Sequence, residues 1–301
     1  MAINSSRRSK SLDQTRATAL GVLAILLWAS LALLTVSASG IPSFELLALT
    51  FGIAFLAGLI VLAARGREGL LELRQPIAPW LTAFAGIFLY HALYFQAMSK
   101  APPAQASLIA YLWPLLIVIL SVLSSGKRLH LRYLAGAVLG FSGSAIFLLQ
   151  RNEQPITVNG LTGYIAAFAC ALVWAGYSVL NRRFKATPSG MLVGVCGAVS
   201  LAGALCHIQL ETTIWPDAKQ WVAIAVLGIG PTGIAFLAWD YATKHGNLSL
   251  LGALSYLAPL VSTLLLIVTG KTEVTVGIIA GAGFIFGGAV IASHPGEARD
   301  E

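Results

Sequence analysis

Residues 102–126 contain no charged side chain. At about 1.5 Å per residue, such a stretch is long enough to cross a lipid bilayer as a helix. Near its middle it carries Tyr111, Trp113 and Pro114, where a simple membrane anchor needs only aliphatic side chains. A proline removes one backbone hydrogen bond and crowds the preceding turn, so this helix is expected to bend inside the membrane.

The same stretch occurs a second time, at residues 247–270. The pattern Tyr-Leu-x-Pro-Leu at residues 111–115 recurs at 256–260, and a Gly-Lys pair follows each copy, ending at Lys127 and Lys271. Repeated spanning helices that are interrupted by proline are typical of secondary transporters. The pattern therefore predicts an internally duplicated membrane protein.

The composition indicates an integral membrane protein. Of the 301 residues, 57% are hydrophobic and only 10% are charged, whereas soluble domains carry about 25% charged residues. The net charge of +7 does not indicate nucleic-acid binding, because the basic residues lie between apolar runs rather than on one face. The lipid bilayer is the expected partner. Three cysteines (Cys170, Cys196 and Cys206) lie inside apolar runs without metal-ligand spacing, so neither a disulfide framework nor a metal site is expected.

Ten apolar segments are long enough to span a membrane. Each is expected to be a helix, because an isolated strand cannot satisfy its backbone hydrogen bonds in lipid. The predicted spans are residues 17–38, 44–64, 78–99, 103–125, 132–149, 160–181, 190–208, 219–243, 248–269 and 273–292.

The basic residues predict the orientation. With the N-terminus in the cytoplasm, most of the 19 lysines and arginines fall on the cytoplasmic side. Only Lys100, Arg151, Lys219 and Lys271 then lie on the opposite side. The positive-inside rule favours this arrangement, and an even number of helices places both termini in the cytoplasm.

The duplication divides the chain into two halves. Residues 17–149 and 150–292 each contain five predicted helices, and residues 1–16 and 293–301 are the two cytoplasmic tails. Because five is odd, the second half must enter the membrane in the opposite sense to the first. The expected fold is therefore an all-α polytopic membrane protein of ten helices in two inverted five-helix repeats.

Glycine and proline positions predict how the helices pack and bend. Glycines four residues apart let two helix backbones approach closely where lipid supplies no hydrophobic driving force. The candidates in the fifth and tenth helices are Gly136 with Gly140, Gly277 with Gly281, and Gly283 with Gly287. Pro114 and Pro259 are expected to act as kinks or hinges of the fourth and ninth helices.

The residues resemble a known family. Ten helices in a five-plus-five repeat, with a fourth helix of the form A-S-L-x-x-Y-L-x-P-L that ends at Gly-Lys, are similar to the EamA-type drug/metabolite transporters. Many relatives place an acidic residue where this chain has Lys127 and Lys271. The resemblance covers about residues 17–292.

Within that superfamily, the aromatic side chains of the third and fourth helices are similar to those of the bacterial aromatic amino-acid exporters of the YddG type. This resemblance implies a carrier in the bacterial inner membrane that exports aromatic and other neutral amino acids. The small-molecule substrate would cross through a central cavity between the halves, as the third–fourth and eighth–ninth helices rock. A monomer is expected, because ten helices can enclose a pathway within one chain.

Several aromatic and polar side chains are predicted at mid-membrane depth, away from the interfaces where tryptophan and tyrosine are normally found. Helical geometry places His91 and Tyr111 about 12 Å below the membrane surface and Trp113 about 15 Å below it. The candidate substrate-binding residues are Trp28, Tyr90, His91, Tyr94, Tyr111, Trp113, Trp174, Tyr177 and Asn181.

Each candidate also has a structural interpretation. An ionisable side chain inside a span favours a functional role for His91, although a neutral imidazole can simply join two helices. Tyr94 and Tyr111 offer hydroxyl groups on apolar rings, which suits an amino-acid substrate. Trp28 and Trp174 can line a cavity or pack in the core.

The carboxylates bear on energy coupling. Glu45 and Asp240 are the only carboxylates predicted inside spans, each about one turn from an end, and Asp240 is expected to pair with Lys244 four residues on. Proton-coupled transporters usually bury a carboxylate nearer the centre. A facilitator is therefore at least as consistent with the sequence as a proton antiporter.

Other functions fit the sequence less well. The chain has no phosphate-binding loop, no HExxH motif and no carboxylate pair at active-site depth, so neither an enzyme nor a bound cofactor is expected. A carrier of the same fold for other neutral or zwitterionic metabolites or drugs remains open. A passive channel has no need of the inverted symmetry.

Overall fold

The computed structural model describes residues 2–126, 130–149, 160–270 and 273–294. Within these ranges every element of regular secondary structure is helical, and ten helices are long and apolar enough to cross a membrane. The ten predicted spans are thereby confirmed. The observed spans are Leu12–Ser37, Ser43–Ala64, Ile77–Lys100, Pro103–Ser125, Leu131–Leu149, Leu161–Phe184, Met191–Leu210, Ala218–His245, Leu248–Val268 and Val276–Ser293.

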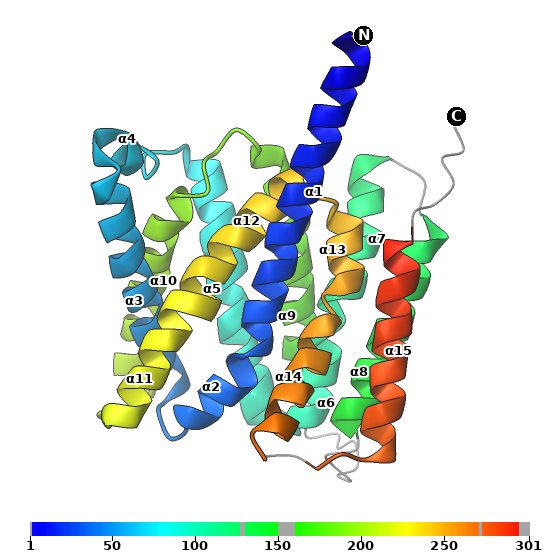
Figure 1. The fold of residues 1–301 in the computed structure, drawn as a ribbon. Helices are drawn as coiled ribbons and strands as arrows, with labels where there is room; N and C mark the ends of the chain where they lie inside the picture. Colours follow the sequence, from blue (N-terminus) through cyan, green and yellow to red (C-terminus); the bar gives the residue numbers. More distant parts are fainter. Residues whose placement is uncertain (1, 127–129, 150–159, 271–272, 295–301) are drawn as a thin grey trace.

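Several spans consist of more than one helical element (Figure 1). The first five spans contain α1 (Ala2–Ala29), α2 (Leu31–Ser37), α3 (Ser43–Ala64), α5 (Ile77–Lys100), α6 (Pro103–Ala110), α7 (Trp113–Ser125) and α8 (Leu131–Leu149), with the short α4 (Gly66–Leu71) after α3. The last five contain α9 (Leu161–Leu180), η2 (Asn181–Phe184), α10 (Met191–Leu210), α11 (Ala218–Leu227), η3 (Gly228–Ile234), α12 (Ala235–His245), α13 (Leu248–Leu254), α14 (Leu257–Val268) and α15 (Val276–Ser293).

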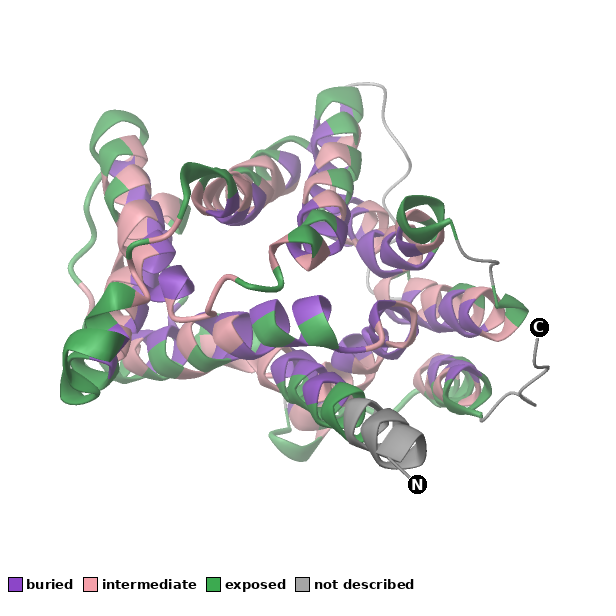
Figure 2. Ribbon diagram, turned by 90° about the horizontal axis from the view of Figure 1, so that it is seen from above, coloured by how far each residue is buried: buried purple, intermediate pink, exposed green. Residues whose placement is uncertain are grey.

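The spans form one bundle with two distinct ends. The α4 end carries α4, the start of α1 and the end of α15, and the α2 end carries α2 and the start of α11 (Figure 1). Viewed from above in Figure 2, the buried parts of the helices lie mainly inside the bundle. Large aliphatic side chains such as Ile60, Leu123 and Val276 are exposed on the outside. An apolar exterior of this kind is the surface expected of a protein surrounded by lipid.

The fifth and tenth spans make a close contact through glycine. A Cβ atom added to Gly136 would lie 2.6 Å from the carbonyl oxygen of Gly288, and one added to Gly143 would lie 2.5 Å from that of Gly281. Gly140 accommodates the ring of Tyr256, since its added Cβ would lie 2.6 Å from that ring. Only glycine lets the backbones of α8 and α15 come this near to each other.

The predicted glycine pairs differ in their surroundings. A Cβ added to Gly283 or Gly287 would meet nothing within 4 Å, so the expectation that this pair packs against another helix is wrong. These residues lie on a face of α15 turned away from α8. Gly277 is half-buried, one turn before Gly281. The contact between α8 and α15 instead involves Gly288, which is not part of any of the predicted pairs of glycines four residues apart.

The fourth and ninth spans are both interrupted next to their prolines. The break between α6 and α7 lies at residues 111–112, and the break between α13 and α14 lies at residues 255–256. Pro114 and Pro259 lie in the first turn of the helix that follows each break. At that position a proline needs no N–H partner, so it fits without distortion.

A third interruption was not predicted. In the eighth span, residues Gly228–Ile234 form a π-helical turn that contains Pro231. The indole Nε1 of Trp28 donates a hydrogen bond to the Pro231 carbonyl oxygen at 3.0 Å. Sequence reasoning could have found this feature, because the run Gly-Ile-Gly-Pro-Thr-Gly lies inside an apolar stretch. The bulge therefore joins the middle of the eighth span to the first.

Candidate functional site

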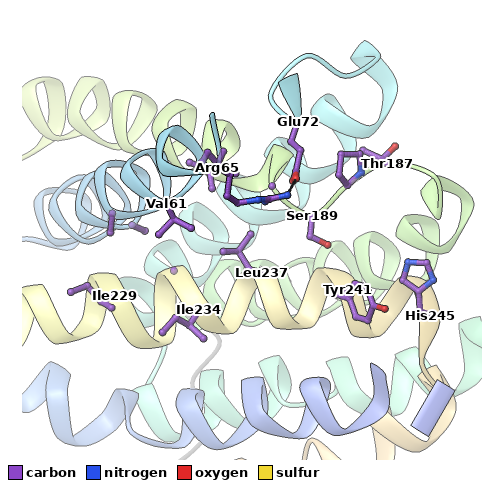
Figure 3. A pocket seen from close by; sticks show the side chains of 18 of the residues that line it. Val61, Arg65, Glu72, Thr187, Ser189, Ile229, Ile234, Leu237, Tyr241 and His245 are labelled. Atoms are coloured by element: carbon purple, nitrogen blue, oxygen red, sulfur yellow. Dashed lines mark hydrogen bonds and ion pairs between the residues drawn. The ribbon is translucent and has the colours of Figure 1, made fainter. Parts of the chain in front are cut away.

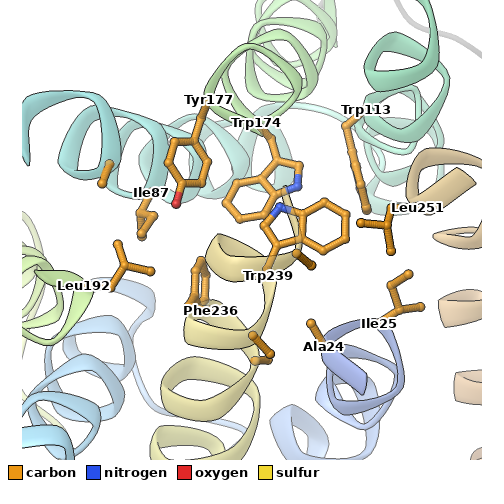
Figure 4. Close-up of a cluster of buried hydrophobic side chains, with 14 of the residues drawn as sticks. Ala24, Ile25, Ile87, Trp113, Trp174, Tyr177, Leu192, Phe236, Trp239 and Leu251 are labelled. Carbon is orange, nitrogen blue, oxygen red and sulfur yellow. The ribbon is translucent and has the colours of Figure 1, made fainter. Parts of the chain in front are cut away.

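Aromatic side chains from separate spans meet in the interior of the bundle. Trp28 of α1 lies with its ring centroid 5.5 Å from that of Trp174 of α9 and 5.2 Å from that of Trp239 of α12. Figure 4 shows Trp174 and Trp239 side by side between Trp113 and Phe236. We call the central part of this set the ring cluster, and through His91 its contacts continue to Phe95 and Phe44. The members of the ring cluster are Trp28, Phe51, Tyr90, His91, Tyr94, Trp113, Trp174, Tyr177, Phe236 and Trp239.

The third span contributes three neighbouring side chains to the ring cluster. The rings of Tyr90 and Tyr94 stack with centroids 6.1 Å apart. Tyr90 also contacts Trp174 at 5.3 Å, and the His91 ring lies 5.3 Å from that of Phe51. All three α5 side chains are half-buried rather than fully enclosed. They can therefore contact both the packed core and a molecule beside it.

The tautomer of His91 follows from its hydrogen bond. Its Nδ1 lies 2.8 Å from the carbonyl oxygen of Ile87, one turn earlier on α5. A carbonyl oxygen can only accept, so Nδ1 carries the proton. In the neutral ring Nε2 is then a hydrogen-bond acceptor, which suits the ammonium group of an amino acid. Protonation would turn the same atom into a donor for a carboxylate.

Trp113 begins α7, directly after the break in the fourth span. Its ring lies 5.9 Å from that of Trp239 and 6.3 Å from that of Trp174, edge-on to both. The position follows from the sequence, because Pro114 fixes the first turn of α7 and so fixes the direction of the preceding side chain. The break thus places a large aromatic ring at mid-bundle.

Tyr111 occupies the break itself and is half-buried. Its backbone carbonyl oxygen accepts a hydrogen bond from the hydroxyl of Tyr256 at 3.0 Å. The ring packs with the hydrophobic cluster around Tyr256 and Ile285. Tyr111, which was predicted to bind the substrate, therefore joins the fourth and ninth spans through its backbone carbonyl group.

Tyr177 is almost fully enclosed. Its ring lies 5.4 Å from that of Trp174, and it packs so closely on Gly86 that an added Cβ there would lie 2.5 Å from the tyrosine. The Tyr177 hydroxyl has no hydrogen-bond partner among the described residues. A buried hydroxyl left without a partner costs about 1–3 kcal/mol. Such a group is a candidate contact for a polar ligand.

Asn181 belongs to a separate polar group at the α4 end, which we call the Asp240 cluster; its members are Asn181, Thr187, Asp240, Thr243 and Lys244. The Asn181 side-chain amide donates to Asp240 Oδ1 at 2.8 Å and to Thr243 Oγ1 at 3.0 Å. Lys244 Nζ donates to Asp240 Oδ2 at 2.8 Å and to the Thr187 carbonyl oxygen at 2.9 Å.

The predicted contact between Asp240 and Lys244 is thus present, and it is completely buried, with 0% and 1% of the two residues exposed. Charges at such depth are tolerated only when they are paired and hydrogen-bonded. Asp240 and Lys244 satisfy each other. They are therefore placed to join the eighth span to the sixth span and to the loop before the seventh.

Glu45 takes part in a second polar group, at the α2 end. Its Oε2 accepts from the Ile214 backbone N–H at 3.0 Å. Glu211 accepts from the N–H of Phe44 and holds His207 Nδ1 at 2.9 Å. A carboxylate at a helix N-terminus is favourable, because the first N–H groups have no partner inside the helix. This group joins the start of α3 to the end of α10.

Three members of the ring cluster were not predicted: Phe51, Phe236 and Trp239. Phe236 and Trp239 are aromatic residues in an apolar run, where they did not stand out. A signal was nevertheless present, because the register that aligns Tyr111 with Tyr256 also aligns His91 with Phe236 and Tyr94 with Trp239. Both are buried in the structure.

The described part of the chain also contains a cavity of about 590 Å³, which lies between α3, η3 and α12 near the α4 end (Figure 3). None of the candidate residues predicted from the sequence lines it. The ring cluster and this cavity are therefore separate features. No group of three metal-ligating side chains occurs among the described residues.

Comparisons with known proteins agree with the resemblance predicted from the residues. The profile of the EamA-like transporter family matches the chain twice, over residues 15–149 and 161–294. The chain is 44% identical over 283 residues to the aromatic amino acid exporter YddG of Ancylobacter novellus, covering 94% of this chain and 98% of that protein.

Two further comparisons cover nearly the whole chain. The aromatic amino acid exporter YddG of Escherichia coli K12 is 25% identical over 294 residues, covering 93% of this chain and 97% of that protein. A crystal structure of a protein with 44% sequence identity superposes with a TM-score of 0.89 and covers 93% of this chain and 97% of that one. The chain thus belongs to the EamA-like transporter family.

Proposed function

We propose that this protein exports aromatic and other neutral amino acids across the bacterial inner membrane by alternating access. The observation that carries the proposal is the ring cluster, which gathers aromatic side chains from α1, α3, α5, α7, α9 and α12 in a chain 44% identical to an aromatic amino acid exporter. A transport site shared by several spans can change its access when those spans move.

The side chains of the ring cluster suit an amino-acid substrate. Trp113 and Trp174 present ring faces and edges to a substrate ring, and each such aromatic contact contributes about 0.5–1.5 kcal/mol. Tyr90 and Tyr94 can offer hydroxyl groups to the substrate's carboxylate. His91 Nε2 is the acceptor for its ammonium group. A zwitterion needs no full countercharge in the site.

The other candidates take supporting roles. Trp28 orders the cluster from α1 and is anchored at the bulge of the eighth span. Tyr111 contacts the substrate from the break in the fourth span, and Tyr177 supplies its unpartnered hydroxyl when the cluster opens. Asn181 acts through the Asp240 cluster rather than through the substrate.

The proposed architecture is an inverted repeat. The two halves, residues 17–149 and 150–292, run in opposite senses, and the tails 1–16 and 293–301 are cytoplasmic. Two observations support this assignment. The family profile matches the chain twice, and the start of α1 and the end of α15 lie at the same end of the bundle (Figure 1). Arg65 at the α4 end supports a cytoplasmic assignment of that end under the positive-inside rule.

The transport movement uses the interruptions of the helices. The fourth and ninth spans bend at the breaks beside Pro114 and Pro259, and the eighth bends at the π-helical turn around Pro231, while the third span rocks with the fourth. Such interruptions lower the cost of bending a helix. The central cavity would open between the ring cluster and one membrane face at a time.

The surroundings of the two intramembrane carboxylates support facilitated export rather than proton antiport. Asp240 is paired with Lys244, and Glu45 accepts a backbone N–H of residue 214. Glu45 lies in the first turn of its span, and Asp240, which directly follows Trp239 of the ring cluster, has its charge balanced by Lys244. The protein works as a monomer in this proposal. Export of another neutral or zwitterionic metabolite by the same cluster is the alternative.

Counterflow in proteoliposomes tests the proposal. Liposomes loaded with phenylalanine should accumulate labelled phenylalanine, tyrosine and tryptophan, and His91→Ala or Trp113→Ala should reduce the initial rate about tenfold or more, because ring contacts of about 1.4 kcal/mol are lost. Leu123→Ala, on the exposed face of α7, is the matched control. Counterflow that is absent, or is unaffected by both cluster variants, would refute the assignment.

Accessibility labelling tests the inverted repeat. Lys127 and Lys271 lie outside the described residues, and the proposal places them on opposite membrane faces. Cysteines introduced at these two positions, in a chain without its native cysteines, should react with a membrane-impermeant reagent from opposite sides. Reaction from the same side would exclude the inverted arrangement.

A further inference from the structure

The cavity between α3 and α12 opens toward the outside of the bundle. Its walls include Ala57 and Val61 of α3, Ile234 of η3 and Leu237 of α12. Val61 is 60% exposed and Ile234 is 48% exposed, so these walls continue into the apolar outer surface. An apolar crevice that continues into the outer surface of a spanning bundle is open to the lipid phase.

Basic side chains gather at the mouth of this crevice. Its lining includes three basic residues, Arg65, Lys185 and His245. Glu72 is the one carboxylate among the lining residues. The Arg65 guanidinium forms an ion pair with that carboxylate, with Nη2 and Oε1 2.5 Å apart. Lys185 is exposed and has no hydrogen-bond or ion-pair partner among the described residues. The mouth therefore carries unbalanced positive charge.

These residues lie at the ends of predicted spans, where lipid headgroups are expected. Arg65 directly follows α3, Lys185 follows η2, and His245 is the last residue of α12. Figure 3 shows Arg65 with Glu72 above the apolar walls, and Tyr241 and His245 at the end of α12. The hydroxyl-bearing Thr187 and Ser189 also line the mouth. Charge and hydrogen-bonding groups thus meet at one end of an apolar channel.

We propose that this crevice is a binding site for an anionic phospholipid. The acyl chains lie between α3 and α12, and the phosphate lies against Lys185, with Thr187 and Ser189 available as donors. Basic pockets between spanning helices are suited to anionic headgroups, and a zwitterionic lipid gains little from the unpaired lysine. An amino acid would satisfy the basic mouth but would leave the apolar channel unfilled.

The bound lipid is expected to hold the eighth span in place. Thr187 lines the crevice, and its carbonyl oxygen accepts a hydrogen bond from the buried Lys244 of α12. Tyr241 and His245 of α12 also border the crevice, with their rings 4.7 Å apart. A lipid in contact with α3 and α12 therefore stabilises the arrangement of these two helices.

Native mass spectrometry of the purified full-length protein tests this site. The protein is mixed with phosphatidylglycerol or phosphatidylcholine of the same acyl composition, and the retained lipids are counted. Lys185→Glu should reduce phosphatidylglycerol retention about fivefold or more, since one lysine near an anionic headgroup contributes roughly that factor. Ala57→Trp, which fills the channel, should reduce retention of both lipids.

Arg74→Glu is the matched control, because Arg74 lies at the same end of the bundle but does not line the crevice. Equal phosphatidylglycerol retention by the Lys185 and Arg74 variants would overturn the proposal, as would equal retention of the two lipids by the wild type. Displacement of phosphatidylglycerol by millimolar phenylalanine would assign the crevice to the transported substrate instead. Thermal unfolding shows whether each variant is folded. If Ala57→Trp does not fold, the comparison of Lys185→Glu with Arg74→Glu tests the proposal by itself.

Discussion

The Tyr256 hydroxyl donates a hydrogen bond to the backbone carbonyl oxygen of Tyr111 at 3.0 Å, and so joins the breaks of the ninth and fourth spans. The Tyr256 ring is buried on Gly140, which adds the fifth span to the same contact. Residues at matching positions of the two sequence copies therefore meet in space. The hydrogen bond therefore links the two breaks directly.

Tyr256→Phe is expected to lower the stability of the protein by about 1 kcal/mol, because the ring contacts remain while the hydrogen bond is lost. Thermal unfolding in detergent should show a decrease of a few degrees in Tm. Tyr241→Phe is the control, because Tyr241 is 40% exposed. Equal Tm values for the Tyr256 variant and the wild type would show that this bond contributes nothing.

The buried pair of Asp240 and Lys244 should behave as a unit. Lys244→Met leaves a buried carboxylate without its countercharge and is expected to destabilise the protein by about 3–5 kcal/mol. Combining it with Asp240→Leu removes both charges and should restore much of that loss. The measurement is a double-mutant cycle on unfolding free energies. Strictly additive effects would contradict the coupling.

The glycine contact between α8 and α15 gives a prediction with an internal control. Gly136→Ala should lower Tm, because the added Cβ would lie 2.6 Å from the Gly288 carbonyl oxygen. Gly283→Ala should leave Tm unchanged or raise it slightly, since nothing lies within 4 Å and alanine is favoured in helices by about 1 kcal/mol. The two variants carry the same chemical change, so a similar Tm for both would argue against the close contact.

Tyr177→Phe should separate stability from function. Removing a hydroxyl that is buried without a partner is expected to stabilise the protein by about 1–3 kcal/mol. If the hydroxyl contacts the substrate in another state, the same change should raise the KM for export. Stability and counterflow kinetics are measured on one preparation. A higher Tm with an unchanged KM would assign Tyr177 to packing alone.

The spans could be predicted because lipid imposes a simple requirement on sequence. A helix must be apolar over its whole length to cross the membrane, and this is visible without any knowledge of neighbouring helices. The pairing of Asp240 with Lys244 was equally local, since side chains four residues apart lie on one helical face. Both expectations depend on a single helix.

The composition of the ring cluster was harder to predict, because it depends on contacts between helices. Phe236 and Trp239 differ little from core residues in an apolar run, whereas His91 and Tyr94 stand out as polar. Asn181 was predicted to bind the substrate, but α9 ends at Leu180 and a tighter turn follows. That turn directs its side chain to Asp240 instead.

The π-helical turn at Gly228–Ile234 determines which way the second part of the eighth span faces. Such a turn accommodates one more residue than a regular α-helix, and one residue corresponds to about 100° of rotation. Shortening the segment by a single residue would therefore turn Trp239 away from its partners and carry the charged pair at positions 240 and 244 toward hydrocarbon. The length of this short segment therefore sets the direction in which every side chain of α12 points.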